Sequence, residues 1–113
     1  MNMSKSAVFS ALAEPTRLGI IEMLTQVGEL SAGDIGRAFE SSASAISQHL
    51  KVLREAGLVV VNKKAQKRMY RLDLDTMQEL EKWINLRTCE WKGRLSAMDR
   101  YLREEKGEGR EQQ

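Results

Sequence analysis

Hydrophobic positions recur with helical spacing between residues 42 and 57. Ile46, Leu50 and Leu53 lie four and three residues apart, so they share one face of a predicted helix. The opposite face carries small or flexible polar side chains and no acidic residue, namely Ser44, Ser47, Gln48 and Lys51. We therefore predict a helix that buries one side and presents a polar, weakly cationic side to a polyanion.

Three shorter helices are predicted before this one. The first two are expected over residues 4–13 and 16–27, on either side of Pro15, because proline is favoured at the first position of a helix. Ser31 and Asp34 have the spacing of a capping box, which opens a third helix. Two short helices joined by a turn of a few residues form a helix-turn-helix, in which the second helix reads DNA.

The pattern changes from helical to extended after Gly57. Residues 58–61 are mostly β-branched and predict a strand, residues 68–72 predict a return strand, and the basic run 62–67 is expected to form the turn. The predicted fold class is therefore mainly α with a small β-hairpin wing, a winged helix-turn-helix. A basic run is often just a solvated loop, but its place after the recognition helix favours contact with phosphate or the minor groove.

A long helix is predicted over residues 73–105, with apolar residues at seven-residue intervals from Met77 to Met98. This apolar length is too great for a small winged helix to cover, so we expect an isologous homodimer through the first and last helices. Trp83 and Trp91 could instead line a ligand pocket. The expected dimer contacts are Val8, Leu12, Met77, Leu80, Ile84, Trp91, Leu95, Met98 and Leu102.

Composition narrows the possible functions. The 113 residues carry a net charge of only +2, whereas residues 62–71 contain five basic and no acidic side chains, which favours a nucleic-acid partner. A single cysteine excludes an intrachain disulfide, and the first residues are too short an apolar run for a signal or membrane segment. We expect a cytoplasmic protein with one domain over residues 1–106 and a disordered tail over 107–113.

Catalytic chemistry has no candidate in the sequence. There is no metal-spaced cluster and no glycine-rich phosphate loop, and His49, the single histidine, lies on the flank of the buried stripe, where a packing role is expected. We expect neither an enzyme nor a cofactor. Cys89, on the long helix, is expected to be a structural thiol, with oxidation or an intermolecular disulfide as the alternative.

Three segments carry a family resemblance. Residues 11–18 (ALAEPTRL), residues 47–59 (SQHLKVLREAGLV) and residues 70–72 (YRL) resemble the ArsR family of bacterial transcriptional repressors. The resemblance covers residues 4–102 in order. It implies a dimeric winged-helix repressor that binds an operator in its own or a neighbouring promoter and blocks transcription.

The departures from the family pattern concern metal sensing. Many metal-sensing members carry ELCVCDL where residues 29–35 read ELSAGDI, so both thiolates that would hold a soft metal are missing. Residues 91–102 are similar to a metal-independent, SdpR-like branch, so we expect no metal site. Within that branch, Ala43 replaces a long polar side chain and Ala65-Gln66 replaces a glycine-containing wing turn.

The expected mechanism places the N-terminal half of the recognition helix in the major groove. Ser44, Ser47 and Gln48 are the candidates for base edges, and glutamine has the bidentate geometry for adenine. Two-fold symmetry then predicts an inverted-repeat operator on double-stranded DNA. The full set of expected DNA contacts is Ser31, Ser42, Ser44, Ser47, Gln48, Lys51, Arg54, Lys63, Lys64, Lys67 and Arg68.

One other function stays open. A winged helix can bind a protein instead of DNA, and Ala43 weakens the reading helix, so a protein-interaction module is the alternative. The sequence does not identify a small-molecule inducer.

Overall fold

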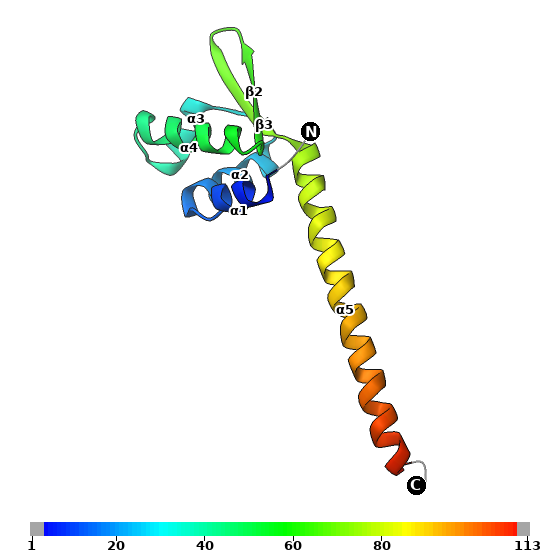
Figure 1. Cartoon of the computed structure of the whole chain (residues 1–113). Coiled ribbons are helices and arrows are strands. Elements are labelled where there is room, and N and C mark those ends of the chain that lie inside the picture. Colours follow the sequence, from blue (N-terminus) through cyan, green and yellow to red (C-terminus); the bar gives the residue numbers. More distant parts are fainter. Residues whose placement is uncertain (1–3, 111–113) are drawn as a thin grey trace. The chain divides into compact units, whose positions relative to one another are not determined.

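The computed structural model describes the backbone of residues 4–110 and the side chains of residues 4–105 (Figure 1). The chain divides into an N-terminal unit that ends at Leu80 and a C-terminal unit that begins at Glu81. The elements are α1 (Lys5–Leu12), α2 (Pro15–Val27), β1 (Leu30–Ser31), α3 (Ala32–Phe39), α4 (Ala43–Glu55), β2 (Val59–Lys64), β3 (Lys67–Leu72) and α5 (Leu74–Arg110). This is the predicted winged helix-turn-helix.

Side-chain caps define where the helices of the N-terminal unit begin. The Ser31 hydroxyl accepts a hydrogen bond from the Asp34 N–H at 3.1 Å, and the Ser42 hydroxyl accepts one from the Ala45 N–H at 3.1 Å. Each bond satisfies a backbone donor that has no partner inside its helix. The capping box predicted at Ser31 and the position of α4 are therefore confirmed.

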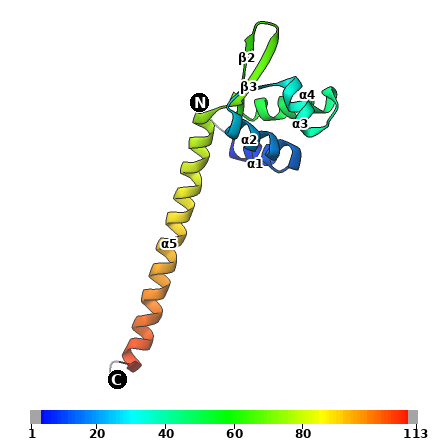
Figure 2. The ribbon, with the colours of Figure 1, turned by 180° about the vertical axis from the view of Figure 1, so that it is seen from behind.

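The wing is longer than the sequence indicated. β2 continues to Lys64 and β3 begins at Lys67, so only Ala65 and Gln66 form the turn, and the expectation of a six-residue turn is wrong. The β-branched run pairs with the return strand in a continuous register, from Val59 opposite Leu72 to Lys64 opposite Lys67. Both views show this hairpin extending beyond α3 and α4 (Figures 1 and 2).

A third strand, β1, completes an antiparallel sheet of order β1-β3-β2. It consists of two residues, Leu30 opposite Tyr70 and Ser31 opposite Met69. Two residues are too few to carry a period-two pattern, which is why the sequence did not predict this strand. The pairing attaches the segment before α3 to the base of the wing.

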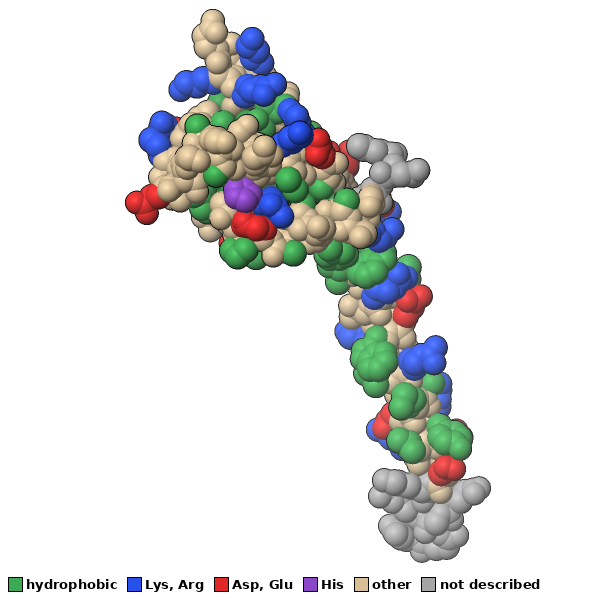
Figure 3. Space-filling view, turned by 60° about the vertical axis from the view of Figure 1, so that its left-hand side comes forward, with side chains coloured by type: hydrophobic (Ala, Val, Ile, Leu, Met, Phe, Trp, Pro, Cys, Tyr) green, Lys and Arg blue, Asp and Glu red, His purple; other side chains and the backbone are tan. Residues whose placement is uncertain are grey.

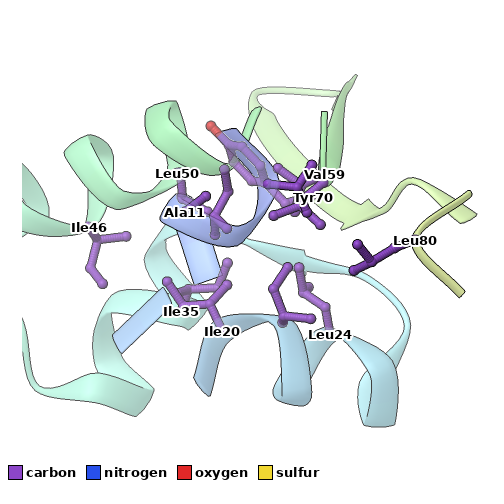
Figure 4. Close-up of a cluster of buried hydrophobic side chains, with 13 residues drawn as sticks. Ala11, Ile20, Leu24, Ile35, Ile46, Leu50, Val59, Tyr70 and Leu80 are labelled. Atoms are coloured by element: carbon purple, nitrogen blue, oxygen red, sulfur yellow. The ribbon is translucent and has the colours of Figure 1, made fainter. Parts of the chain in front are cut away.

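The core lies between the helices and the sheet (Figure 4). Ile46, Leu50 and Leu53 of α4 are almost fully buried there, so the predicted buried stripe is confirmed. Burial of one such aliphatic side chain stabilises the fold by about 1.5–3 kcal/mol. Val8 and Leu80 belong to the same cluster, at 0% and 7% exposure.

Their burial corrects two of the expected dimer contacts. Because Val8 and Leu80 are already covered within one chain, their side chains form core rather than a surface for a second chain. Leu12 and Met77 are partly buried and pack against the core. The stripe of α5 is apolar as predicted, but its first residues, Met77 and Leu80, pack in the N-terminal unit.

The ends of α4 and α5 follow from backbone conformation. Gly57, which follows the end of α4, has φ +82°, a left-handed conformation that favours glycine. α5 continues to Arg110, past the residue at which the expected disordered tail begins, and residues 111–113 lie outside the described residues. Each residue added to an existing helix gains one backbone hydrogen bond, so the helix extends past the apolar stripe.

Candidate nucleic-acid interface

The turn between α3 and α4 holds the two helices together. Glu40 adopts a left-handed conformation, with φ 51°, and the Ser41 N–H then donates to the Gly36 carbonyl at 3.3 Å. The ring of Phe39 packs over Gly19 of α2, where an added Cβ would lie 2.8 Å from the ring. α4 is therefore anchored through its own core stripe and through the end of α3.

The polar face of α4 is exposed along its whole length. Ser44, Ser47 and Gln48 are exposed near its start, and Lys51 and Arg54 follow toward its end. The first three fit the expected contacts with base edges, and the two cations fit contacts with phosphate. The sequence therefore placed the polar face correctly, while its DNA contacts remain a prediction. Ala43, the first residue of α4, is exposed as well and adds only a methyl group to this face.

Ser31 does not support the phosphate contact expected of it. Its side chain is 7% exposed, and its hydroxyl already binds the Asp34 N–H. The Asp34 carboxylate occupies the same helix start. Hydrogen bonds from Ser31 hold the pKa of this carboxyl below its ordinary value, although partial burial opposes them. The paired Arg37 guanidinium also lowers it. A carboxylate already supplies the negative charge that a helix N-terminus favours, so a phosphate would meet repulsion there.

The wing carries its basic residues on both strands. Lys63 lies opposite Arg68 and Lys64 opposite Lys67, so four cations flank the turn. Lys64 differs from the others because its Nζ lies 2.8 Å from Oε1 of Glu29, which precedes β1. Lys64 therefore ties the wing to its base, and Lys63, Lys67 and Arg68 are the exposed cations left for a polyanion. Figure 3 shows Lys and Arg side chains gathered along this hairpin.

A groove of about 560 Å³ joins the two candidate DNA-binding parts. Its floor includes the buried side chains of Ile46 and Leu50, and its rim includes Ser47 of α4 and Arg68 of β3. Small residues of α3 leave room on the far side. The groove lies beside the polar face of α4, and Arg68 places a cation on its wing side.

A polar cluster lies on the other flank of α4. Arg17 of α2 donates from Nε to the Ala11 carbonyl at 2.7 Å, and its Nη1 lies 3.3 Å from Nδ1 of His49. Nε2 of His49 lies 3.6 Å from Oε2 of Glu14, the residue that caps α2. In Figure 3 the histidine lies beside one acidic and one basic side chain. These polar partners of His49 were not predicted from the sequence.

Glu14 is ionised more readily than an ordinary glutamate. Partial burial opposes its charge, but hydrogen bonds from the Thr16 and Arg17 backbone and the neighbouring His49 lower the pKa of its carboxyl. Its other oxygen accepts from the Thr16 N–H. The cluster therefore has a fixed anion at one end and a guanidinium at the other, with His49 between them.

The C-terminal unit exposes the rest of the apolar stripe of α5. Trp91 is 59% exposed, and the other large apolar residues of the stripe are also exposed, namely Ile84, Leu95, Met98 and Leu102. Figure 3 shows hydrophobic side chains repeating along this helix. Trp83 instead stacks with Arg87, whose guanidinium lies 5.2 Å from the ring centre.

The alternative of a ligand pocket at Trp83 and Trp91 stays a prediction. A shallow hollow on α5 is lined by Trp91 and not by Trp83, together with Arg87, Glu90, Arg94 and Ala97. Cys89 is exposed on the same helix. At about 100° per residue it lies on nearly the opposite side from Trp91. The apolar stripe thus lies on one side of α5, and the Cys89 thiol lies on the other.

The described residues offer neither a metal cluster nor a membrane span. Among them, no three His, Cys, Asp or Glu side chains are grouped so that they could hold a metal ion. No helix in this part of the chain is long and apolar enough to cross a membrane.

Comparison with known proteins places this architecture among transcriptional regulators. Residues 14–61 match the model of the "bacterial regulatory protein, arsR family". The transcriptional repressor SdpR of Bacillus subtilis is 35% identical over 68% of this chain and 84% of its own length. The arsenical resistance operon repressor of Escherichia coli is 43% identical over 58% of this chain but only 56% of its own length.

A solved structure agrees with these sequence matches. The homodimeric winged helix-turn-helix DNA-binding domain of Mb0332 from Mycobacterium bovis, described as a possible ArsR-family regulator, is 28% identical. It matches with a TM-score of 0.61, over 75% of this chain and 78% of that chain. Sequence, fold and an exposed recognition helix agree: the chain belongs to the ArsR family of bacterial transcriptional regulators.

Proposed function

We propose that the protein is a homodimeric repressor that binds an inverted-repeat operator. α4 enters the major groove, where Ser44, Ser47 and Gln48 meet base edges, and the wing lies on the flanking backbone. One observation carries this proposal: Ser44, Ser47, Gln48 and Lys51 of α4 are exposed on the helix that lies beside a basic hairpin, while the apolar face of the helix is buried in the core. The repressor SdpR, similar over most of its length, supports the direction of regulation.

The groove between α3, α4 and β3 extends this interface. Arg68 on its rim and Ser47 on the helix lie where a phosphate and its sugar can pass between wing and recognition helix. Lys51 and Arg54 of α4 and Lys63 and Lys67 of the wing supply further cations. Contacts to phosphate position a protein on DNA, whereas contacts to base edges select the sequence.

Dimerisation follows from the exposed stripe of α5. Helices in proteins gain most of their stability from packing of an apolar face. The stripe from Ile84 to Leu102 is exposed among the described residues. A second copy of the chain supplies that cover, with Leu12 of α1 at the margin. The homodimer reported for the Mb0332 domain supports this assembly.

The proposal needs neither a metal nor catalysis. Serine and glycine stand at positions 31 and 33, where many metal-sensing relatives carry thiolates, so a soft metal has no ligands there. We therefore propose a regulator that acts by occupying DNA in the cytoplasm.

A gel shift tests the proposal. The purified protein is mixed with DNA from upstream of its own coding region, with excess random DNA, at two salt concentrations, with and without a chelator. A discrete complex that survives competitor and chelator and weakens steeply with salt is expected, because bound cations release counterions from DNA. No complex with this DNA or with any duplex selected from a random pool, together with salt-tolerant binding to a protein, would favour the protein-interaction alternative.

A further inference from the structure

Three side chains join the recognition helix to the turn between α1 and α2. Arg17 binds the Ala11 carbonyl at the end of α1 and Nδ1 of His49 on α4, and Glu14 faces Nε2 of the same ring. His49 directly follows Gln48, so its ring lies at the edge between the buried stripe and the exposed face. The cluster therefore touches α1, α2 and α4 at the margin of the base-reading surface.

The chemistry of the partners defines the tautomer of His49. A guanidinium can only donate, so Nδ1 must accept and carries no proton. The single ring proton of the neutral imidazole then sits on Nε2, which faces the acceptor oxygen of Glu14 at 3.6 Å. Protonation of Nδ1 would place two donors face to face, at the 3.3 Å that now separates it from Arg17.

We propose that Glu14, Arg17 and His49 form a clamp that orients α4 and thereby raises the preference of the protein for its operator over random DNA. This inference rests on the proposed DNA-binding function. All three are positioning residues, since they act through the direction of Gln48 and not by touching a base. Binding to random DNA rests mainly on contacts between cations and phosphate, so it depends less on the direction of Gln48.

The first test is spectroscopic and needs no DNA. The chain contains one histidine, so ¹⁵N NMR of the ring nitrogens reports on His49 alone. Above pH 7.5 the Nε2–H tautomer is expected, with Nδ1 unprotonated. Arg17→Lys keeps the positive charge but loses the guanidinium group that contacts both the Ala11 carbonyl and His49. This variant should therefore show a mixture of the two His49 tautomers. An Nδ1–H tautomer in the unmodified protein would overturn the clamp.

The second test compares two substitutions of the ring. The glutamine amide offers an acceptor and a donor, as the neutral imidazole does, whereas leucine offers neither. The probe is a duplex of about three helical turns, selected from a random pool by the unmodified protein. His49→Leu should reduce the ratio of operator to random-DNA affinity about tenfold, as expected for loss of one hydrogen bond from a charged donor.

The conservative variant separates positioning from simple damage. His49→Gln should retain most of the affinity ratio, because its amide group can both accept and donate a hydrogen bond. Thermal unfolding and circular dichroism confirm that each variant is folded before DNA is added. An unchanged ratio in folded His49→Leu overturns the clamp alone, whereas failure of the unmodified protein to select any duplex overturns the proposed function and this inference together.

Discussion

α4 and the C-terminal part of α5 carry the same kind of amphipathic pattern but differ in what covers the apolar side. In α4, Ile46, Leu50 and Leu53 are buried by the chain's own core, and the polar face is left outside. In α5, the residues from Ile84 to Leu102 keep their apolar side exposed. A pattern therefore defines a helix and its faces, but the surrounding chain decides whether the apolar face folds the monomer or binds a partner.

The largest contrast is expected from removing one apolar side chain of α4. Leu50→Ala leaves a cavity in the core and should lower the free energy of unfolding by about 2–5 kcal/mol. Urea unfolding followed by circular dichroism measures it. Lys51→Ala, one residue away on the exposed face, is the matched control and should change stability by less than about 0.5 kcal/mol. Equal losses would mean that the stripe of α4 is not the buried one.

The corresponding change in α5 should act on assembly. Trp91→Ala removes the largest exposed ring of the stripe and should weaken dimerisation by about 2 kcal/mol or more, as central aromatic residues of interfaces do. Sedimentation across a dilution series measures the dimer fraction. Leu86→Ala is the control, since Leu86 is similarly exposed but lies off the stripe by helical spacing. A dimer insensitive to Trp91→Ala would require a different interface.

The polar face of α4 should give a smaller, selective effect. Gln48→Ala should cost about 1–3 kcal/mol on the selected operator and little on random DNA, because it removes a base contact and no phosphate contact. Fluorescence anisotropy with both DNAs provides the comparison. Equal losses on the two DNAs would remove Gln48 from the base-reading residues.

The wing offers a pair of lysines for a finer comparison. Lys67→Ala should reduce the salt dependence of binding to all DNA by about 0.9 in log–log slope for each phosphate that the variant no longer neutralises. Lys64→Ala should change it less, because Nζ of Lys64 is engaged with Glu29. Binding titrations at four salt concentrations distinguish them. A larger change for Lys64→Ala would mean that its ion pair opens on DNA.

A fall in pH should destabilise the N-terminal unit first. Glu14 and Asp34, the described carboxyls whose pKa is lowered, both lie there. A lowered pKa in the folded state contributes stability above the pKa of the unfolded state, and this is lost as pH falls through the folded value. Asp34→Asn should therefore reduce stability at pH 7 and make little difference near pH 2. A constant difference across that range would argue against the ionised cap.

Most of the fold could be predicted because its signals are local. The stripe of α4 and the capping box at Ser31 are each visible within one segment and were placed correctly. The sequence did not reveal β1, since two residues carry no period. It also could not tell that Leu80 packs into the core while Ile84, four residues later, stays exposed.

The candidate site was predictable in composition but not in pairing. The polar face of α4 and the basic wing were predicted to be DNA-binding surfaces from their residue types and their order in the chain. The ion pair of Lys64 with Glu29 and the contact of Arg17 with His49 join residues 35 and 32 positions apart. Such pairs depend on tertiary packing, so no local pattern distinguishes Lys64 from Lys63 or assigns a partner to His49.

The position of Cys89 has a practical consequence for studying the assembly. It is the only thiol of the chain, it is exposed, and helical spacing places it away from the apolar side of α5. A maleimide dye attached there labels each subunit once, without a cysteine substitution and without covering the stripe. Energy transfer between donor-labelled and acceptor-labelled chains can then follow subunit exchange in real time, with unlabelled chains as the competitor.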